Sequence, residues 1–136
     1  MSKAPGPVVL LVQPRDDDGL EMYVEALRNH GLTPLAVSNA RDALAVAPKA
    51  DVIVTGVLLP GSTDGIGLIA QLRRNEQTRH TPIIVLTVCW WQTERERCQD
   101  AGCDVFLPKP CPPDALLREV RRLLAASDLT LLTQTA

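Results

Sequence analysis

The stretch Pro7-Val8-Val9-Leu10-Leu11-Val12, which ends at Gln13-Pro14, decides the fold of this chain. Every residue from Val8 to Val12 is aliphatic, so the run lacks the alternation that marks a strand with one face in water. A continuous apolar run of this length is typical of a strand buried on both faces, as in parallel sheets covered by helices. The sequence therefore predicts a buried parallel strand here.

Outward from this strand, apolar runs alternate with helical patterns along the rest of the chain. Because strands and helices alternate, we expect a parallel sheet with helices on both faces and right-handed crossovers. The other predicted strands are Thr33–Val37, Asp51–Val57, Pro82–Thr87 and Val105–Leu107. The predicted helices run from Leu20 to Gly31, from Asn39 to Ala47, from Ile66 into the polar residues near Arg74–His80, from Thr93 to Ala101 and from Pro112 to Ala126.

Local signals bound the first helix on both sides. Asp16-Asp17-Asp18 suit a helix N-terminus, because their side-chain oxygens accept from unpaired amides and their charge meets the positive end of the dipole. Gly31 is expected to end the helix in the left-handed conformation. His30 beside it is expected to interact with the C-terminal end of the dipole.

Length and composition exclude several classes of protein. The chain has 136 residues, of which 46% are apolar and 22% charged, and its formal net charge is −2. We expect one domain over residues 7–126 with short tails at 1–6 and 127–136. The negative charge and the aromatic content of 3% argue against nucleic-acid binding. No apolar run approaches the ~20 residues that span a membrane, and no signal peptide is recognisable, so we expect a cytoplasmic protein.

The topology also indicates where a site would form. In open parallel sheets, ligands bind outside the carboxyl ends of the strands, at the switch point of the topology. The residues that the sequence places at these ends are Gln13-Pro14-Arg15, Gly56, Thr87 and Lys109. We therefore expect these residues to meet at one edge of the sheet.

Four short motifs, in this order and at this spacing, are specific in combination. From Val8 to Ala126 the chain resembles a response-regulator receiver domain, which implies a flavodoxin-like (βα)5 doubly wound sheet of strand order 2-1-3-4-5. The resemblance also implies a cis peptide bond at Lys109-Pro110. The motifs are Asn29-His30-Gly31, Leu59-Pro60-Gly61-Ser62-Thr63-Asp64-Gly65, Ile83–Thr87 and Phe106-Leu107-Pro108-Lys109-Pro110.

The chemistry implied by the resemblance is phosphoryl transfer onto an aspartate. It needs a carboxylate at the end of the third strand, and an acidic pair after the first strand to hold Mg²⁺. Carried over to this sequence, the acceptor position falls on Gly56 and the acidic pair on Gln13 and Pro14. None of these residues has a carboxylate, so the sequence predicts a degenerate receiver that is no enzyme and holds no metal or cofactor.

Other positions of the family pattern are retained. Thr87 and Lys109 match the residues that contact the phosphoryl oxygens, and Phe106 matches the switch aromatic. A slip in the alignment could bring Asp16 toward the pocket, but it would not restore a carboxylate at Gly56. The half of the site that binds the metal and accepts the phosphoryl group is therefore predicted to be missing, while the other half persists.

The first functional hypothesis is a stand-alone signalling module that acts through protein contacts. Its partner would be a histidine kinase, a downstream signalling protein or a second copy of the chain, and neither nucleic acid nor a membrane is expected. The resemblance implies an interface formed by the fourth helix, the fifth strand and the fifth helix. Trp90 and Trp91 precede that helix, and they would either anchor the interface or close the core beneath it.

Two alternatives use other residues. The first is a ligand or thiol-redox sensor at the strand ends, in which Arg15 and Lys109 would form an anion-accepting pocket. Its thiols would be Cys89 and Cys111, which both follow strand ends and would lie near Thr87. Cys98 and Cys103 flank the end of the fourth helix, and all four cysteines lack metal-finger spacing and are otherwise expected to be ordinary reduced thiols. The second is a Mg²⁺-dependent phosphoacceptor that uses a displaced acid such as Asp64, which would otherwise only support the turn before Gly65.

Overall fold

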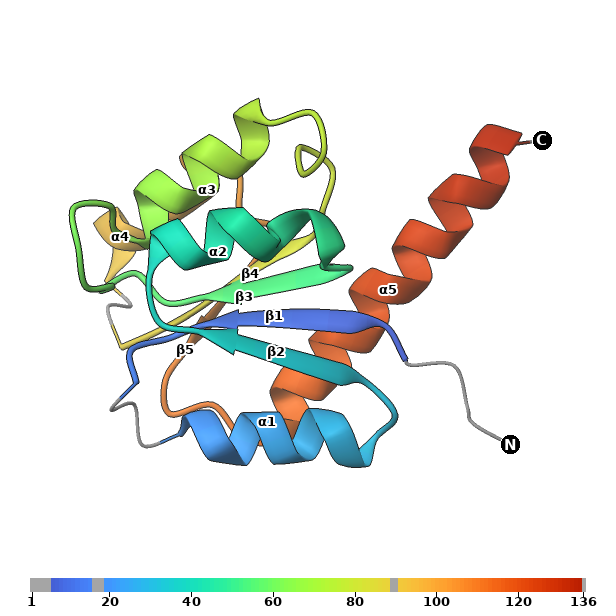
Figure 1. Ribbon diagram of the computed structural model, residues 1–136, viewed down its shortest axis with the longest axis horizontal. Coiled ribbons are helices and arrows are strands. Elements are labelled where there is room, and N and C mark those ends of the chain that lie inside the picture. Colours follow the sequence, from blue (N-terminus) through green and yellow to red (C-terminus); the bar gives the residue numbers. More distant parts are fainter. Residues whose placement is uncertain (1–5, 16–18, 89–90, 136) are drawn as a thin grey trace.

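The computed structural model describes residues 6–15, 19–88 and 91–135, with the backbone alone described for 128–135. Its five strands form one parallel sheet in the order β2-β1-β3-β4-β5, which confirms the predicted flavodoxin-like fold (Figure 1). The strands are β1 (Val8–Val12), β2 (Thr33–Val37), β3 (Val52–Thr55), β4 (Ile83–Thr87) and β5 (Val105–Pro108). The helices are α1 (Leu20–Asn29), α2 (Ala40–Val46), α3 (Gly65–Arg74), α4 (Gln92–Ala101) and α5 (Pro113–Thr135), with a 3-10 turn η1 (Ala47–Lys49) after α2.

The sheet separates two apolar cores, one on each face. Helices α1 and α5 cover one face, while α2, α3 and α4 cover the other (Figure 1). Within β1, Val9 and Leu11 pack into the first core, and Leu10 and Val12 pack into the second. The absence of alternation in β1 thus has its expected cause, because both faces of the strand are covered.

The C-terminus of α1 has the predicted form. Gly31 has a φ of +83°, and the amide of Leu32 donates to the Leu27 carbonyl at 3.0 Å, as in a Schellman motif. The Nδ1 atom of His30 lies 2.8 Å from the Ala26 carbonyl, so this histidine contacts the last turn of the helix as expected. The predicted N-terminal residues Asp16-Asp17-Asp18 lie outside the described part of the chain.

Some element boundaries differ from the predictions. Strand β3 is shorter than predicted, because Asp51 and the residues Gly56-Val57 lie outside it. Asp51 instead accepts from the Val8 amide with its carboxylate at 2.8 Å. The last helix was expected to end at Ala126, but α5 continues to Thr135 and projects past the sheet (Figure 1). No glycine or proline occurs between Ser127 and Thr135, so the sequence holds no residue that stops a helix there.

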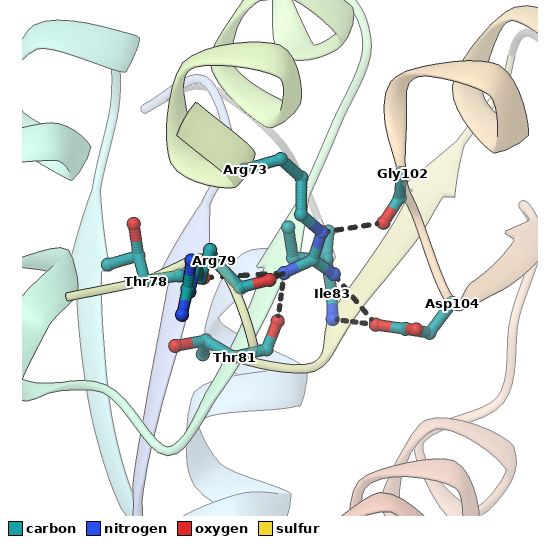
Figure 2. A network of polar contacts seen from close by, with 7 residues as sticks. All are labelled: Arg73, Thr78, Arg79, Thr81, Ile83, Gly102 and Asp104. Atoms are coloured by element: carbon teal, nitrogen blue, oxygen red, sulfur yellow. Dashed lines mark hydrogen bonds and ion pairs between the residues drawn. The ribbon is translucent and has the colours of Figure 1, made fainter. Parts of the chain in front are cut away.

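The amino ends of β4 and β5 are held by a single side chain from α3, that of Arg73 (Figure 2). Its Nε donates to the Gly102 carbonyl at 3.0 Å, where α4 ends. Its guanidinium also donates to carbonyls of the connection between α3 and β4, namely those of Thr78, Arg79 and Thr81 at 3.3, 3.1 and 2.7 Å.

Asp104 completes this network from the start of β5. Arg73 Nη2 donates to Asp104 Oδ2 at 2.9 Å, and the amide of Ile83 donates to the same oxygen at 2.8 Å. The carboxylate therefore joins the first residue of β4 to α3 and to the turn before β5 (Figure 2). No feature of the sequence pattern indicated this network, because Arg73 looks like an ordinary cation in the last turn of a helix.

Candidate functional site

The carboxyl ends of β1, β3 and β4, together with the residues after β5, surround one open cavity. The Gly56 amide donates to the Val12 carbonyl at 2.9 Å, and the Lys109 amide donates to the Thr87 carbonyl at 2.8 Å, so the parallel register itself brings these ends together. The cavity has a volume of about 250 Å³. It is lined by Gln13, Pro14, Gly56, Val57, Leu58, Leu86, Thr87, Val88 and Lys109. The residues that the sequence placed at the strand ends thus meet, with the exception of Arg15.

Gln13 is the central polar side chain of this cavity and is only 2% exposed. Lys109 Nζ donates to Gln13 Oε1 at 3.1 Å, across 96 positions of sequence. Gln13 Nε2 in turn donates to the Leu86 carbonyl at 3.5 Å, a longer and weaker contact. The amide therefore connects the residue after β5 with the end of β4.

Gly56 contributes only backbone to the cavity. A Cβ atom at this position would lie 3.3 Å from Gln13 Oε1 and 3.5 Å from Gln13 Nε2. The Gln13 amide thus lies against the space that a side chain at position 56 would enter. A carboxylate at 56 would require this amide to move.

The charge of the described lining differs from that of a cation site. Lys109 is the one charged residue among the described residues that line the cavity, and none of them is acidic. Within 6–15, 19–88 and 91–135, no three His, Cys, Asp or Glu side chains are grouped so that they could hold a metal ion. A hard cation such as Mg²⁺ prefers oxygen ligands that carry charge, and the described lining offers none.

The segment after β5 is held at several points. The Lys109-Pro110 peptide bond is cis, as the sequence predicted. The Tyr23 hydroxyl, which is buried beneath α1, donates to the Cys111 carbonyl at 2.6 Å. Together with the two bonds of Lys109, this contact ties the connection between β5 and α5 to β1, β4 and α1.

Asp64 has the turn-supporting role that the sequence allowed for it. It is the N-cap of α3, and its Oδ1 accepts from the Gly67 amide at 2.8 Å. It lines a separate hollow beside α3 with Gly61 and Arg74, rather than the cavity at the strand ends. The carboxylate proposed as a displaced acceptor thus has a structural use of its own.

The predicted anion pocket of Arg15 and Lys109 is not assembled. Arg15 is exposed and lines a different hollow of about 260 Å³, beside Ser38 and Asp42. Of the two residues, only Lys109 lines the cavity at the strand ends. The two hollows share only Gln13 among their described lining residues, because the chain turns away from the sheet edge at Pro14.

The described cysteines are poor candidates for a redox sensor. Burial raises the pKa of Cys98 to about 12 and that of Cys103 to about 11, and it also raises the pKa of Cys111. Reactive cysteines have lowered pKa values, because the thiolate is the nucleophile. Cys111 packs in the core beneath α1 and α5 instead of facing the cavity. Cys89 lies outside the described residues.

The aromatic residues divide between core and surface. Phe106 packs at the edge of the core beneath α2, α3 and α4, and the Arg95 guanidinium carbon lies 5.8 Å from its ring centroid. The Trp91 side chain is 58% exposed at the start of α4, so it does not close the core beneath that helix. Trp90 lies outside the described part of the chain.

Two exposed apolar residues at the rim were not singled out from the sequence. Leu58 is 62% exposed and Val88 is 57% exposed, and both line the cavity, Leu58 from the connection after β3 and Val88 directly after β4. With Trp91 they place three large apolar side chains on the connections that follow these two strands. Both residues follow the predicted strands, which end at Val57 and Thr87, but the sequence alone does not show that their side chains are exposed.

Comparison with known proteins identifies a family over most of the chain. The family model of the response regulator receiver domain matches residues 9–121. The protein PilH of Pseudomonas aeruginosa is 30% identical over 114 residues, which are 81% of this chain and 93% of PilH. The phosphate regulon transcriptional regulatory protein PhoB of the same organism is 33% identical over 123 residues, which are 88% of this chain but only 52% of PhoB.

Solved structures give the same result. The receiver domain of the sensor histidine kinase PA1611 from Pseudomonas aeruginosa, whose structure has a magnesium ion in the active site cleft, matches with a TM-score of 0.80 and 30% identity. The match covers 88% of this chain and 98% of that one. The chemotaxis response regulator CheY4 of Vibrio cholerae matches with a TM-score of 0.77 and 29% identity, over 87% of this chain and 98% of CheY4.

Proposed function

This chain belongs to the response regulator receiver family of two-component signalling, and on that premise we propose that it works without a phosphoryl group at the usual position. The observation that carries the proposal is Gly56, a residue without a side chain at the end of β3. Formation of an aspartyl phosphate needs a carboxylate oxygen as the nucleophile, and backbone atoms cannot replace it. We therefore propose a signalling module without catalytic activity of its own.

The residues around Gly56 also support the proposal that no phosphoryl group is accepted at this position. Phosphoryl transfer relies on a cation that neutralises the developing charge. Gln13 and Pro14 stand where the resemblance places the acidic pair, and Gln13 already accepts a hydrogen bond from Lys109. Among the described lining residues, the groups that would contact phosphoryl oxygens remain while those that would hold Mg²⁺ are absent.

Incubation with acetyl phosphate and Mg²⁺, followed by intact mass measurement, tests the proposal. We expect no added phosphoryl mass on the wild-type chain. The control is the triple variant Gln13→Asp, Pro14→Asp and Gly56→Asp, which supplies three carboxylates at the strand ends and should gain one phosphoryl group. A base-labile phosphoryl adduct on the wild type would overturn the proposal, and its loss in Asp64→Asn would identify Asp64 as the acceptor.

We further propose that the output passes through contacts with a histidine kinase, a downstream signalling protein or a second copy of the chain. The exposed side chains of Leu58, Val88 and Trp91 support this, because tryptophan is enriched among the residues that dominate binding energy at interfaces. Light scattering of the wild type tests self-association. If the chain forms a dimer through this surface, Trp91→Ala should weaken the dimer about tenfold or more, whereas Met22→Ala, a change at an exposed residue of α1, should not.

The redox alternative has less support than this proposal. The three described thiols have raised pKa values, and none of them lines the cavity.

We propose a cytoplasmic location because that is where two-component signalling of this type would meet its partners. In the described part of the chain, no helix is both long enough and apolar enough to cross a membrane.

A further inference from the structure

We propose that Gln13 is a positioning residue whose side-chain oxygen takes the place of a phosphoryl oxygen as the partner of Lys109. On this view Gln13 and Gly56 form a matched pair, in which the amide occupies the space left by the missing side chain. The inference rests on the proposed function, and it adds that the polar groups of the site already bond one another, as Lys109 does with Gln13. The segment between β5 and α5 would then keep one position whether or not a phosphodonor is present.

The first support is the bond between Gln13 and Lys109. The ammonium donor carries a full charge, and hydrogen bonds with a charged partner are about twice as strong as neutral ones. Gln13 is 2% exposed, so water competes little for its oxygen. The bond joins the residue after β1 to the residue after β5, which are at opposite ends of the chain but at the same edge of the sheet.

The second support is the fit between Gln13 and Gly56. A Cβ atom at position 56 would lie 3.3 Å from Gln13 Oε1 and 3.7 Å from Gln13 Cδ. The first separation is tight for a carbon-oxygen contact, so a side chain at position 56 would require the Gln13 side-chain amide to shift by a few tenths of an ångström. The position in which Gln13 bonds Lys109 therefore fits best when residue 56 is glycine.

The third support is the residue type at position 13, whose side chain ends in an amide. A glutamine amide both accepts and donates, so the same group can accept from Lys109 and donate to the Leu86 carbonyl. A carboxylate at position 13 could accept from Lys109, but it would have no proton for that carbonyl. A methionine would fill the same volume and make neither bond.

These bonds converge on the segment that begins at Lys109. The Lys109 amide donates to the Thr87 carbonyl, and the Tyr23 hydroxyl donates to the Cys111 carbonyl. Gln13 adds the contact from β1. If Gln13 is removed, the segment keeps these two backbone contacts but loses the hydrogen bond between Lys109 Nζ and the residue after β1.

A double-mutant cycle tests the matched pair. In the wild-type background, Gly56→Ala should lower the equilibrium constant for folding roughly tenfold. In the Gln13→Ala background, the same change should cost less than about threefold, because the space is open. In the Gln13→Met background it should again cost roughly tenfold, because the volume is retained. Equal costs in the Gln13→Ala and wild-type backgrounds would overturn the matched pair.

NMR tests the positioning role of Gln13. If Gln13 acted only by filling space, the signals of Lys109 would not change when its hydrogen bond is removed. In Gln13→Met, the side-chain signals of Lys109 and the amide signal of Cys111 should shift, while Gln13→Glu should restore the Lys109 signals toward wild type. Unchanged Lys109 signals in Gln13→Met would refute the role of Gln13. Uptake of phosphoryl mass by the wild type would instead refute the proposed function, so the two failures can be told apart.

Discussion

The two edges of the sheet are held in different ways. At the amino edge, the single side chain of Arg73 makes five hydrogen bonds that join α3, β4, α4 and β5. At the carboxyl edge, Gln13 makes two, and one of them is long. Exposed apolar side chains gather at the carboxyl edge, where Leu58 and Val88 line the cavity.

The difference shows how the two edges respond to the loss of one side chain. Removal of Arg73 takes away five hydrogen bonds at the amino edge, whereas removal of Gln13 takes away two of those described at the carboxyl edge. Binding regions are drawn from the less stable parts of a protein, because they must be able to rearrange. We therefore expect mutations at the amino edge to change stability, and mutations at the carboxyl edge to change the state of the site.

The largest effect is expected from Arg73→Ala. The change removes the side-chain donor of several carbonyls and leaves the Asp104 carboxylate with the Ile83 amide but without its ion pair, so the free energy of unfolding should fall by about 2–4 kcal/mol. Urea unfolding measures it. Arg73→Lys should recover little of the loss, because an ammonium cannot reproduce the planar fork of donors.

The neighbouring Arg74 supplies a matched control. It is exposed, and Arg74→Ala should change the free energy of unfolding by no more than about 0.5 kcal/mol. A loss from Arg73→Ala that is no larger than the loss from Arg74→Ala would show that the Arg73 network does not stabilise the amino edge.

A glycine pair sharpens the account of Arg73. Gly31 and Gly102 both have positive φ values, of +83° and +119°, but only Gly102 would bring a Cβ atom to 2.8 Å from Arg73 Cγ. Gly31→Ala should therefore cost about 1 kcal/mol and Gly102→Ala about 2–3 kcal/mol. In an Arg73→Ala background the two costs, measured by thermal or urea unfolding, should become similar. Costs that stay apart would mean that the conformation at Gly102, rather than Arg73, sets the difference.

Substitutions of Asp64 test whether this carboxylate only caps α3 or also accepts a phosphoryl group. Asp64→Ala removes the N-cap of α3 and should lower the free energy of unfolding by about 1 kcal/mol. Asp64→Ser retains a capping oxygen and should lose only a few tenths of that value. Neither variant should differ from the wild type in the phosphoryl mass gained on treatment with acetyl phosphate. A phosphoryl adduct that the wild type carries and both variants lack would show that Asp64 takes part in the reaction.

The last prediction concerns the thiols of α4 and the turn after it. The pKa values of Cys98 and Cys103 are raised from 9.0 to about 12 and about 11, so the folded state disfavours their ionisation more than the unfolded state does. Their contribution to stability is therefore fully present below pH 9 and is lost as the pH rises through the folded-state values.

Comparison with the double variant Cys98→Ala, Cys103→Ala isolates this effect from other groups that titrate in the same range. The wild type should lose more stability between pH 8 and about pH 10.5 than the variant does, as measured by urea unfolding. Alkylation of both thiols at pH 8 should also be slower than that of a free model thiol. If the stability of the wild type and that of the double variant changed with pH in the same way, these thiols would lie in more polar surroundings than the core provides.

The sequence alone determined much of this protein. The continuous apolar runs specified buried parallel strands, and Gly31 specified the end of α1, because both signals act through neighbouring residues. The residue types at Gly56, Gln13 and Pro14 also showed that no carboxylate occupies those positions, since that statement needs no coordinates. The predicted end of the last helix at Ala126 was wrong, since α5 continues to Thr135 and no glycine or proline precedes that residue in the extension.

Only the tertiary structure decided which side chains meet. The hydrogen bond between Gln13 and Lys109 spans 96 positions, and the network of Arg73 reaches Asp104 across 31. Arg15 and Lys109 look equivalent in the sequence, yet the chain path after Pro14 places them in separate hollows. Hydrogen-bond partners depend on where strands and connections end in space, and periodicity along a chain carries no information about that position.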